Sequence, residues 1–206
     1  MDLSRLEREL KKRWAYPYRW GRKQADDWDS KTTFIYTTYA FNTLLKRIET
    51  LNDALQNYAL NRWYNYWSAK GVEYLFSSYA TVEAHHNVYD KKVDFTIQGI
   101  PFDHKTTVFP KGFGKDYTYA IAHKKELIQW LYENQSQQGR KHLSNRLFVV
   151  LMDVKNHKHW KLKAEMPLFK TVIQEYMSTF NKQQLVQLDF GQGVVYSDIL
   201  WLKKQE

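Results

Sequence analysis

The sequence predicts an α/β protein in which a helical N-terminal part precedes a small β-sheet. Three observations predict this class. Apolar residues recur at helical spacing between residues 34 and 79. Apolar and polar residues alternate between residues 92 and 107, as in strands that have one buried face. A near-continuous apolar run covers residues 147–153, as in a strand that is buried on both faces.

The N-terminal part is expected to be helical. Residues 3–13 have the pattern of a charged amphipathic helix, which is not that of a signal peptide. An aromatic and basic connector occupies residues 14–30. The helical pattern that follows is longer than a typical globular helix, so we expect a break near Asn52–Asp53 or at Gly71.

A three-strand antiparallel meander should come next. The first strand is expected at Thr81–Tyr89, followed by a turn at Asp90–Lys91. The second and third strands form a hairpin around Gly99, which pairs residue 97 with residue 100 or residue 98 with residue 101.

The C-terminal half continues the alternation of helices and strands. We expect a helix from about Tyr119 to Gln137, and then the buried strand of residues 147–153. A helix over about Lys163–Lys182 follows, and Pro167 is a position where it could restart. The tail Gly193–Trp201 should add an edge strand. These elements fit a single domain of residues 1–206. Within it we distinguish a helical extension (1–53), a core (54–153), and a C-terminal helix and edge strand (154–206).

Composition narrows the functional classes. The chain has 206 residues, a net charge of +9 and a hydrophobic content of 43%, which together fit a folded protein with a polyanionic partner. The alternative to a polyanionic partner is that the positive charge serves only to keep the protein soluble. There is no cysteine, which excludes disulfides and cysteine-based zinc sites. No apolar run is long enough to span a bilayer, so we expect a cytoplasmic protein without a membrane partner.

The predicted hairpin gathers chemically useful side chains. Both registers place Asp94, Asp103 and Lys105 on one face of the sheet, because a shift by one residue would split the apolar set. Two carboxylates on rigid strands suit a hard cation such as Mg²⁺ or Mn²⁺. A lysine beside such an ion can orient a water molecule and stabilise charge on a phosphate. An ordinary surface Asp–Lys pair is the alternative interpretation.

The element order and the spacing Asp94…Asp103-His104-Lys105 resemble the PD-(D/E)xK nuclease superfamily. This superfamily has a restriction endonuclease-like core of a helix, a three-strand antiparallel meander, a helix and a further strand. The resemblance covers residues 54–153. It implies that Asp94 and Asp103 ligate Mg²⁺ (or Mn²⁺), with the backbone carbonyl of His104 as a further ligand. It also implies that Lys105 positions the attacking water.

Many members of the superfamily place a glutamate on the helix before the first strand. Glu73 occupies that place here, among largely inward-facing residues, so the resemblance adds it to the catalytic and metal-binding set. A salt bridge between Glu73 and a nearby basic residue is the alternative. One departure is that the acid of the third strand, Asp103, is aspartate rather than glutamate, which shortens its reach toward the metal.

The resemblance implies a Mg²⁺-dependent endonuclease that hydrolyses DNA, for example of the restriction or mobile-element type. RNA as the substrate stays open, and a homodimer is plausible because duplex cleavage by such folds often needs two active sites. A catalytically inactive nucleic-acid-binding protein on the same fold is the alternative function. A zinc site built from His85-His86 and His157-x-His159 is a further alternative, although no carboxylate stands at a fixed spacing from these histidines.

Overall fold

The computed structural model describes residues 1–20, 26–85, 93–134, 144–191 and 193–205. They form two compact units: Met1–Val72 with Lys163–Met166, and Glu73–Leu162 with Pro167–Glu206. We predicted an N-terminal extension that ends at residue 53, whereas the first unit extends to Val72. No helix in the described part of the chain has both the length and the apolar character needed to cross a bilayer.

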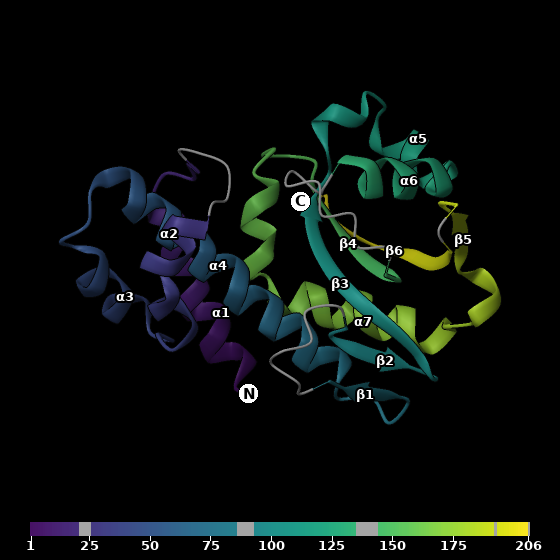
Figure 1. The fold of residues 1–206 in the computed structure, drawn as a ribbon, viewed down its shortest axis with the longest axis horizontal. Helices are drawn as coiled ribbons and strands as arrows, with labels where there is room; N and C mark the ends of the chain where they lie inside the picture. The colour runs from purple at the N-terminus through teal and green to yellow at the C-terminus, as the bar shows by residue number, and fades with distance from the viewer. Residues whose placement is uncertain (21–25, 86–92, 135–143, 192, 206) are drawn as a thin grey trace. The chain divides into compact units, whose positions relative to one another are not determined.

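The first unit is helical, as predicted. Its α-helices are α1 (Leu3–Lys12), α2 (Asp26–Lys31), α3 (Phe41–Ile48) and the part of α4 (Asp53–Phe76) up to Val72 (Figure 1). Two short 3₁₀-helices accompany them, η1 (Arg13–Ala15) and η2 (Thr33–Tyr36).

The long helical pattern breaks at Asn52–Asp53, which is one of the two expected positions. Asn52 precedes α4 and its Oδ1 accepts the N–H of Leu55 at 3.0 Å, which caps the helix. Gly71 does not break the helix. A Cβ atom there would lie 2.7 Å from the Sδ of Met166 and 2.8 Å from the Cδ2 of Leu6, so glycine allows a close approach of these side chains.

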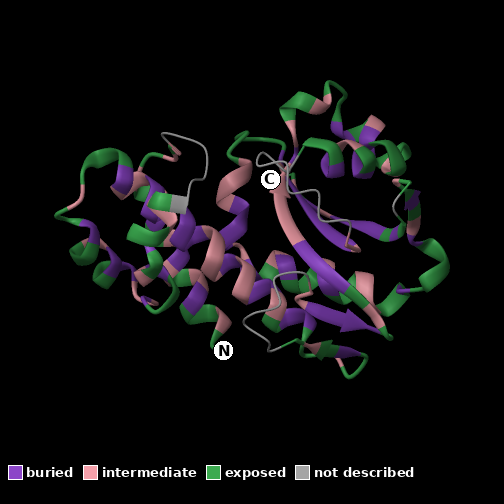
Figure 2. Cartoon of the chain, viewed as in Figure 1, coloured by how far each residue is buried: buried purple, intermediate pink, exposed green. Residues whose placement is uncertain are grey.

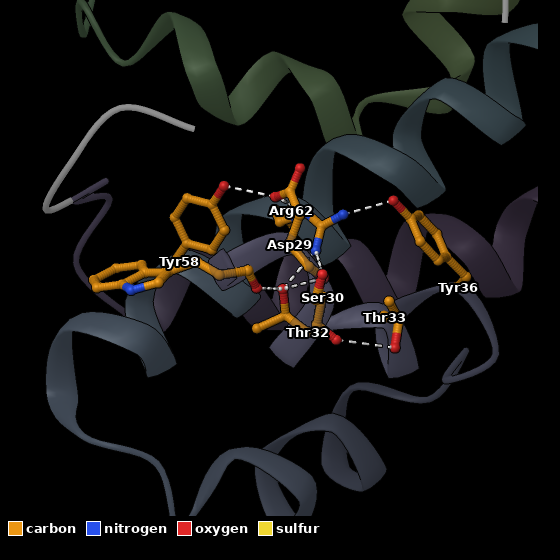
Figure 3. Close-up of polar contacts among 8 residues, drawn as sticks. Asp29, Ser30, Thr32, Thr33, Tyr36, Tyr58 and Arg62 are labelled. Atoms are coloured by element: carbon orange, nitrogen blue, oxygen red, sulfur yellow. Dashed lines mark hydrogen bonds and ion pairs between the residues drawn. The ribbon is translucent and has the colours of Figure 1, made fainter. Parts of the chain in front are cut away.

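The interior of the first unit combines aromatic and polar groups. Trp63 is fully buried, and its Nε1 donates to the carbonyl of Thr38 at 2.6 Å. Beside it along α4, Arg62 is buried among hydroxyl groups and a carboxylate (Figure 3). The side chains around its guanidinium include Asp29, Thr32 and Tyr36. This unit is therefore held by a hydrogen-bonded network as well as by apolar packing.

Lys163 is a buried cation of the first unit. Its Nζ donates to Oδ1 of Asn65 at 2.7 Å, and burial lowers the pKa of the Lys163 ammonium to about 8. In the unfolded chain the same group keeps its proton up to about pH 10.4. Between these two pH values the unfolded state binds more protons than the folded state, so the contribution of this group to stability rises with pH.

As the pH rises from about 7 to about 9.5, the unfolding free energy of the wild-type protein should therefore rise by about 1–2 kcal/mol more than that of Lys163→Met. Urea unfolding at a series of pH values measures this difference. Lys46→Met, at an exposed position of α3, is the matched control and should keep the wild-type pH profile. Parallel pH profiles for wild type and Lys163→Met would contradict the assignment.

The described residues of the second unit form a six-stranded sheet in the order β1-β2-β3-β4-β6-β5 (Figure 1). The strands are β1 (Val82–Ala84), β2 (Phe95–Ile97), β3 (Ile100–Val108), β4 (Arg146–Asp153), β5 (Val186–Asp189) and β6 (Val194–Lys204). The β1–β2, β2–β3 and β5–β6 pairs are antiparallel, whereas β3–β4 and β4–β6 are parallel. The chain is thus of the mixed α/β class, as predicted.

The hairpin between β2 and β3 has one of the two expected registers. Ile97 pairs with Ile100, and the intervening residues Gln98 and Gly99 have φ values of 47° and 80°. Positive φ at both positions is typical of a type I′ turn, whose twist matches that of the flanking strands. The expected turn at Asp90–Lys91 lies outside the described residues.

The C-terminal edge of the sheet differs from the prediction. We expected residues 193–201 to form an edge strand, but β6 lies between β4 and β5. The edge strand is β5, whose four residues, Val-Gln-Leu-Asp, are too few to give a clear strand pattern.

The helices of the second unit largely follow the prediction. They are α5 (Tyr117–Ala122), α6 (Lys124–Asn134) and α7 (Met166–Thr179), with 3₁₀-helices η3 (Lys111–Phe113), η4 (His159–Ala164) and η5 (Lys182–Gln184). The end of η4 and the first residue of α7 belong to the first unit. A break at His123 divides the single helix expected between residues 119 and 137, of which residues 135–137 lie outside the described part. Pro167 is the second residue of α7. The first N–H groups of a helix have no acceptor within it, so a proline, which lacks an N–H, costs no helical hydrogen bond there.

Strand β4 is buried on both faces, as the apolar run predicted. Phe148 and Val150 pack against apolar residues of α5 and α6, whereas Leu147 and Val149 alternate to the other face. Figure 2 shows buried residues along the middle strands of the sheet. On the face of Leu147, α7 approaches β6, since the Tyr176 hydroxyl donates to Oδ2 of Asp198 at 3.3 Å.

Candidate metal centre

The hairpin departs from regular pairing at Asp94, immediately before β2. Phe95 is the ladder partner of Phe102, yet the N–H of Asp94 donates to the carbonyl of Phe102 at 2.8 Å. Two residues of one strand therefore face one residue of the other, which is the pattern of a β-bulge. A bulge redirects the side chain that it carries.

The redirected carboxylate of Asp94 lies against His104. Its Oδ2 accepts the backbone N–H of His104 at 2.7 Å and lies 3.4 Å from the ring Nδ1 of the same residue. Strand β2 begins only at Phe95, so the carboxylate of Asp94 occupies the place of a backbone acceptor beside β3. It thereby satisfies an N–H that the sheet leaves unpaired.

Glu73, in the last turn of α4, completes a group of three residues. Glu73, Asp94 and His104 each offer one ligand atom, and these atoms lie within 4.8 Å of one another. A stack of rings holds the group in place. Phe76 stacks on Phe95 with ring centroids 4.6 Å apart, and Phe95 stacks on the imidazole of His104 at 6.2 Å. We call Glu73, Asp94 and His104 the acid–imidazole group.

The electrostatics of this group favour a cation. Burial opposes the charge on Asp94, but the contacts of its carboxylate with the ring and the backbone N–H of His104, together with the charge of Lys105, outweigh burial and lower the pKa of Asp94 to about 2. This carboxylate is therefore ionised at neutral pH. The imidazole of His104 is buried, and no other described residue completes a hydrogen bond with its Nδ1.

Asp103 has different partners. Its Oδ1 contacts Nζ of Lys105, and its Oδ2 lies 3.6 Å from Nε of Arg146, which faces it on the parallel strand β4. Burial raises the pKa of Asp103, and the charge of Asp94 acts in the same direction, against the two cations. Asp103, Lys105 and Arg146 thus form an ion cluster on one face of the sheet.

The structure places the predicted residues near one another. Asp103 and Lys105 share a face, as the alternation of β3 requires. Asp94 lies close enough for its charge to raise the pKa of Asp103 and for Lys105 to lower the pKa of Asp94, but its direct contacts are with His104. The prediction assigned the backbone carbonyl of His104 to the metal; the structure adds its ring, which offers a ligand atom to the group. The expected approach of Glu73 to Asp94 is found.

The predicted set omitted Arg146. No local pattern could have identified it, because its place opposite Asp103 depends on the register of two parallel strands. Two histidines of the alternative zinc site have hydrogen-bond partners in the protein. His85 Nε2 lies 2.8 Å from Oγ1 of Thr96, and His159 Nδ1 accepts the N–H of Asp153 at 2.9 Å. His86 lies outside the described residues.

Comparison with known proteins gives no relative: no family model matches the sequence, and neither the curated proteins nor the solved structures include a match. The function is therefore argued from the chemistry of these side chains.

Proposed function

We propose that this protein is a metal-dependent nuclease that hydrolyses phosphodiester bonds in DNA. The observation that carries the proposal is the position of two groups on successive residues of β3. The acid–imidazole group includes His104, and the ion cluster includes Asp103 and Lys105 on either side of it. The charge of Lys105 acts on the Asp94 carboxylate of the acid–imidazole group, so a bound cation and this ammonium could act on the same phosphate.

The residues fit a divalent cation. Two carboxylates and a buried imidazole offer three ligand atoms in close proximity, and Asp94 is ionised at neutral pH. When bound, such an ion would stabilise negative charge on the scissile phosphate and make a water molecule more acidic. Lys105 keeps 43% of its side chain exposed, so its ammonium can orient a water molecule or contact a phosphate oxygen while it contacts Asp103.

Two further features support the choice of substrate and reaction. The net charge of +9 favours a polyanion such as DNA. The element order α4, β1–β2–β3, α5–α6, β4 supports the likeness to the PD-(D/E)xK nucleases, in which the corresponding core carries the catalytic acids and lysine. DNA cleavage of the restriction or mobile-element type is the form of the proposal that we test.

Metal removal tests the proposal directly. We expect protein treated with excess EDTA to leave plasmid, linear duplex and single-stranded DNA intact, and we expect added Mn²⁺ or Mg²⁺ to restore cleavage, because the phosphate charge is then neutralised. Gel electrophoresis of each substrate over time measures both results. Cleavage that persists at full rate in EDTA would show that hydrolysis does not need this centre.

A second function is favoured by one observation. The carboxylate of Asp103 contacts Lys105 and lies near Arg146, so two cations of the protein already compensate one of the two acids that the superfamily pattern assigns to the metal. A nucleic-acid-binding protein without turnover fits that arrangement. It would bind DNA with a steep salt dependence and leave it intact even when Mn²⁺ is saturating.

A further inference from the structure

We infer that the imidazole of His104 is itself a metal ligand, together with Glu73 and Asp94, and that this nitrogen makes the site select Mn²⁺ over Mg²⁺. The inference deepens the proposed function, but it rests only on the metal-binding part of that function and does not depend on hydrolysis. A ring nitrogen of His104 would then occupy the metal-ligand position that the sequence pattern assigns to Asp103.

The ring of His104 is buried and, within the described part of the chain, has an unsatisfied nitrogen. His104 is 5% exposed, and its Nδ1 has no hydrogen-bond partner among the described residues. A buried polar atom without a partner costs about 1–3 kcal/mol, so such an atom calls for a ligand. This nitrogen lies 3.4 Å from Oδ2 of Asp94, within the group that also contains Glu73.

Neighbouring side chains fix the orientation of the His104 ring. Histidines that bind metals usually hold their other ring nitrogen in a hydrogen bond, which fixes the orientation of the ring. Nε2 of His104 lies 3.4 Å from Oγ1 of Thr106, two residues further along β3. Phe95 stacks on the same ring. These contacts leave Nδ1 as the nitrogen that faces the carboxylates.

The acid–imidazole group offers two carboxylates and one imidazole as ligands. Asp103 contacts Lys105 and lies near Arg146, so its carboxylate is already compensated by two cations. The third ligand of the acid–imidazole group is therefore nitrogen. Mg²⁺ prefers oxygen ligands and gives up its water reluctantly, whereas Mn²⁺ accepts carboxylate oxygen and binds imidazole more readily. A site with one nitrogen and two carboxylates should thus discriminate between the two ions.

The test is pulsed electron paramagnetic resonance of Mn²⁺ bound to the whole protein. We expect the wild-type spectrum to contain a nitrogen coupling from a directly bound imidazole, and we expect His104→Gln to lose it. His85→Gln, at a histidine that bonds Thr96 on the same sheet, is the matched control and should keep the coupling. By calorimetry, the wild-type protein should bind Mn²⁺ at least about tenfold more tightly than Mg²⁺, and His104→Gln should lose this preference.

Wild-type protein that binds Mn²⁺ without any nitrogen coupling would overturn the inference, and this measurement does not depend on how well the variant folds. The outcomes also separate the two proposals. A nitrogen coupling in a protein that leaves DNA intact would support the ligand assignment and reject the nuclease. Cleavage that is equally fast in Mg²⁺ and Mn²⁺, with no nitrogen coupling, would support the nuclease and reject the ligand assignment.

Discussion

Asp94→Asn should reduce metal-dependent DNA cleavage by at least about 100-fold. The amide is neutral, so it cannot replace a carboxylate whose low pKa keeps it charged and available to a cation. The fold should survive, because the amide oxygen of asparagine can still accept the N–H of His104. Single-turnover cleavage at a fixed Mn²⁺ concentration measures the loss.

The matched control is Asp116→Asn. Asp116 is an exposed residue that caps α5, where its Oδ1 accepts the N–H of Tyr119 at 2.7 Å. Asparagine caps helices as well as aspartate does, so this variant removes one charge from the same unit and should cleave at the wild-type rate. Equal rates in wild type and Asp94→Asn would remove Asp94 from the proposed site. Retained DNA binding by Asp94→Asn would show that the loss concerns chemistry.

Local patterns decided the parts of the fold that the sequence predicted correctly. The turn at Gln98–Gly99 needs two residues that tolerate positive φ, and β4 needs an unbroken apolar run, so both are visible over a few residues. Strand β5 has only four residues and takes its place by pairing with β6, which is a long-range contact. The boundary between the two units falls inside the continuous helix α4, where no change in the helical pattern marks it.

The candidate site shows the same limit. Strict alternation correctly placed Asp103 and Lys105 on one face, because β3 is regular there. It did not predict that the carboxylate of Asp94 contacts His104, because a bulge adds one residue to one strand and a two-residue repeat cannot anticipate that addition. The ring of His104 could be assigned a role only after the bulge had brought a carboxylate to it. One informative signal was present in the sequence: His104 alternates with Phe102 on the apolar side, where a polar ring needs a partner.

Arg62 should carry the largest single contribution to the stability of the first unit among its polar residues (Figure 3). Its guanidinium donates to the carbonyl of Asp29 at 2.8 Å, to the hydroxyl of Thr32, and to the hydroxyl of Tyr36 at 2.6 Å. Its Nε lies 3.2 Å from Oδ1 of Asp29, which also accepts the hydroxyl of Tyr58 at 2.7 Å. A planar group with several fixed donors satisfies all these acceptors at once.

Arg62→Met should therefore lower the free energy of unfolding by about 2–4 kcal/mol. Methionine fills much of the same space, so the loss comes from acceptors that are left without their donor and from a carboxylate that loses its cation. Lysine can supply one charge but not the planar set of donors, so Arg62→Lys should also stay below wild type. Urea unfolding followed by tryptophan fluorescence measures both variants, since the buried Trp63 is the next residue along α4.

Arg8→Met is the matched control, because Arg8 is an exposed residue of α1 in the same unit. Removing an exposed charge should change the unfolding free energy by no more than about 0.5 kcal/mol. If the urea midpoint of Arg62→Met equalled that of Arg8→Met, the network around Arg62 would contribute no net stability. That result would mean that the desolvation of the guanidinium cancels its hydrogen bonds, and apolar packing around residues such as Trp63 would then account for the stability of the unit.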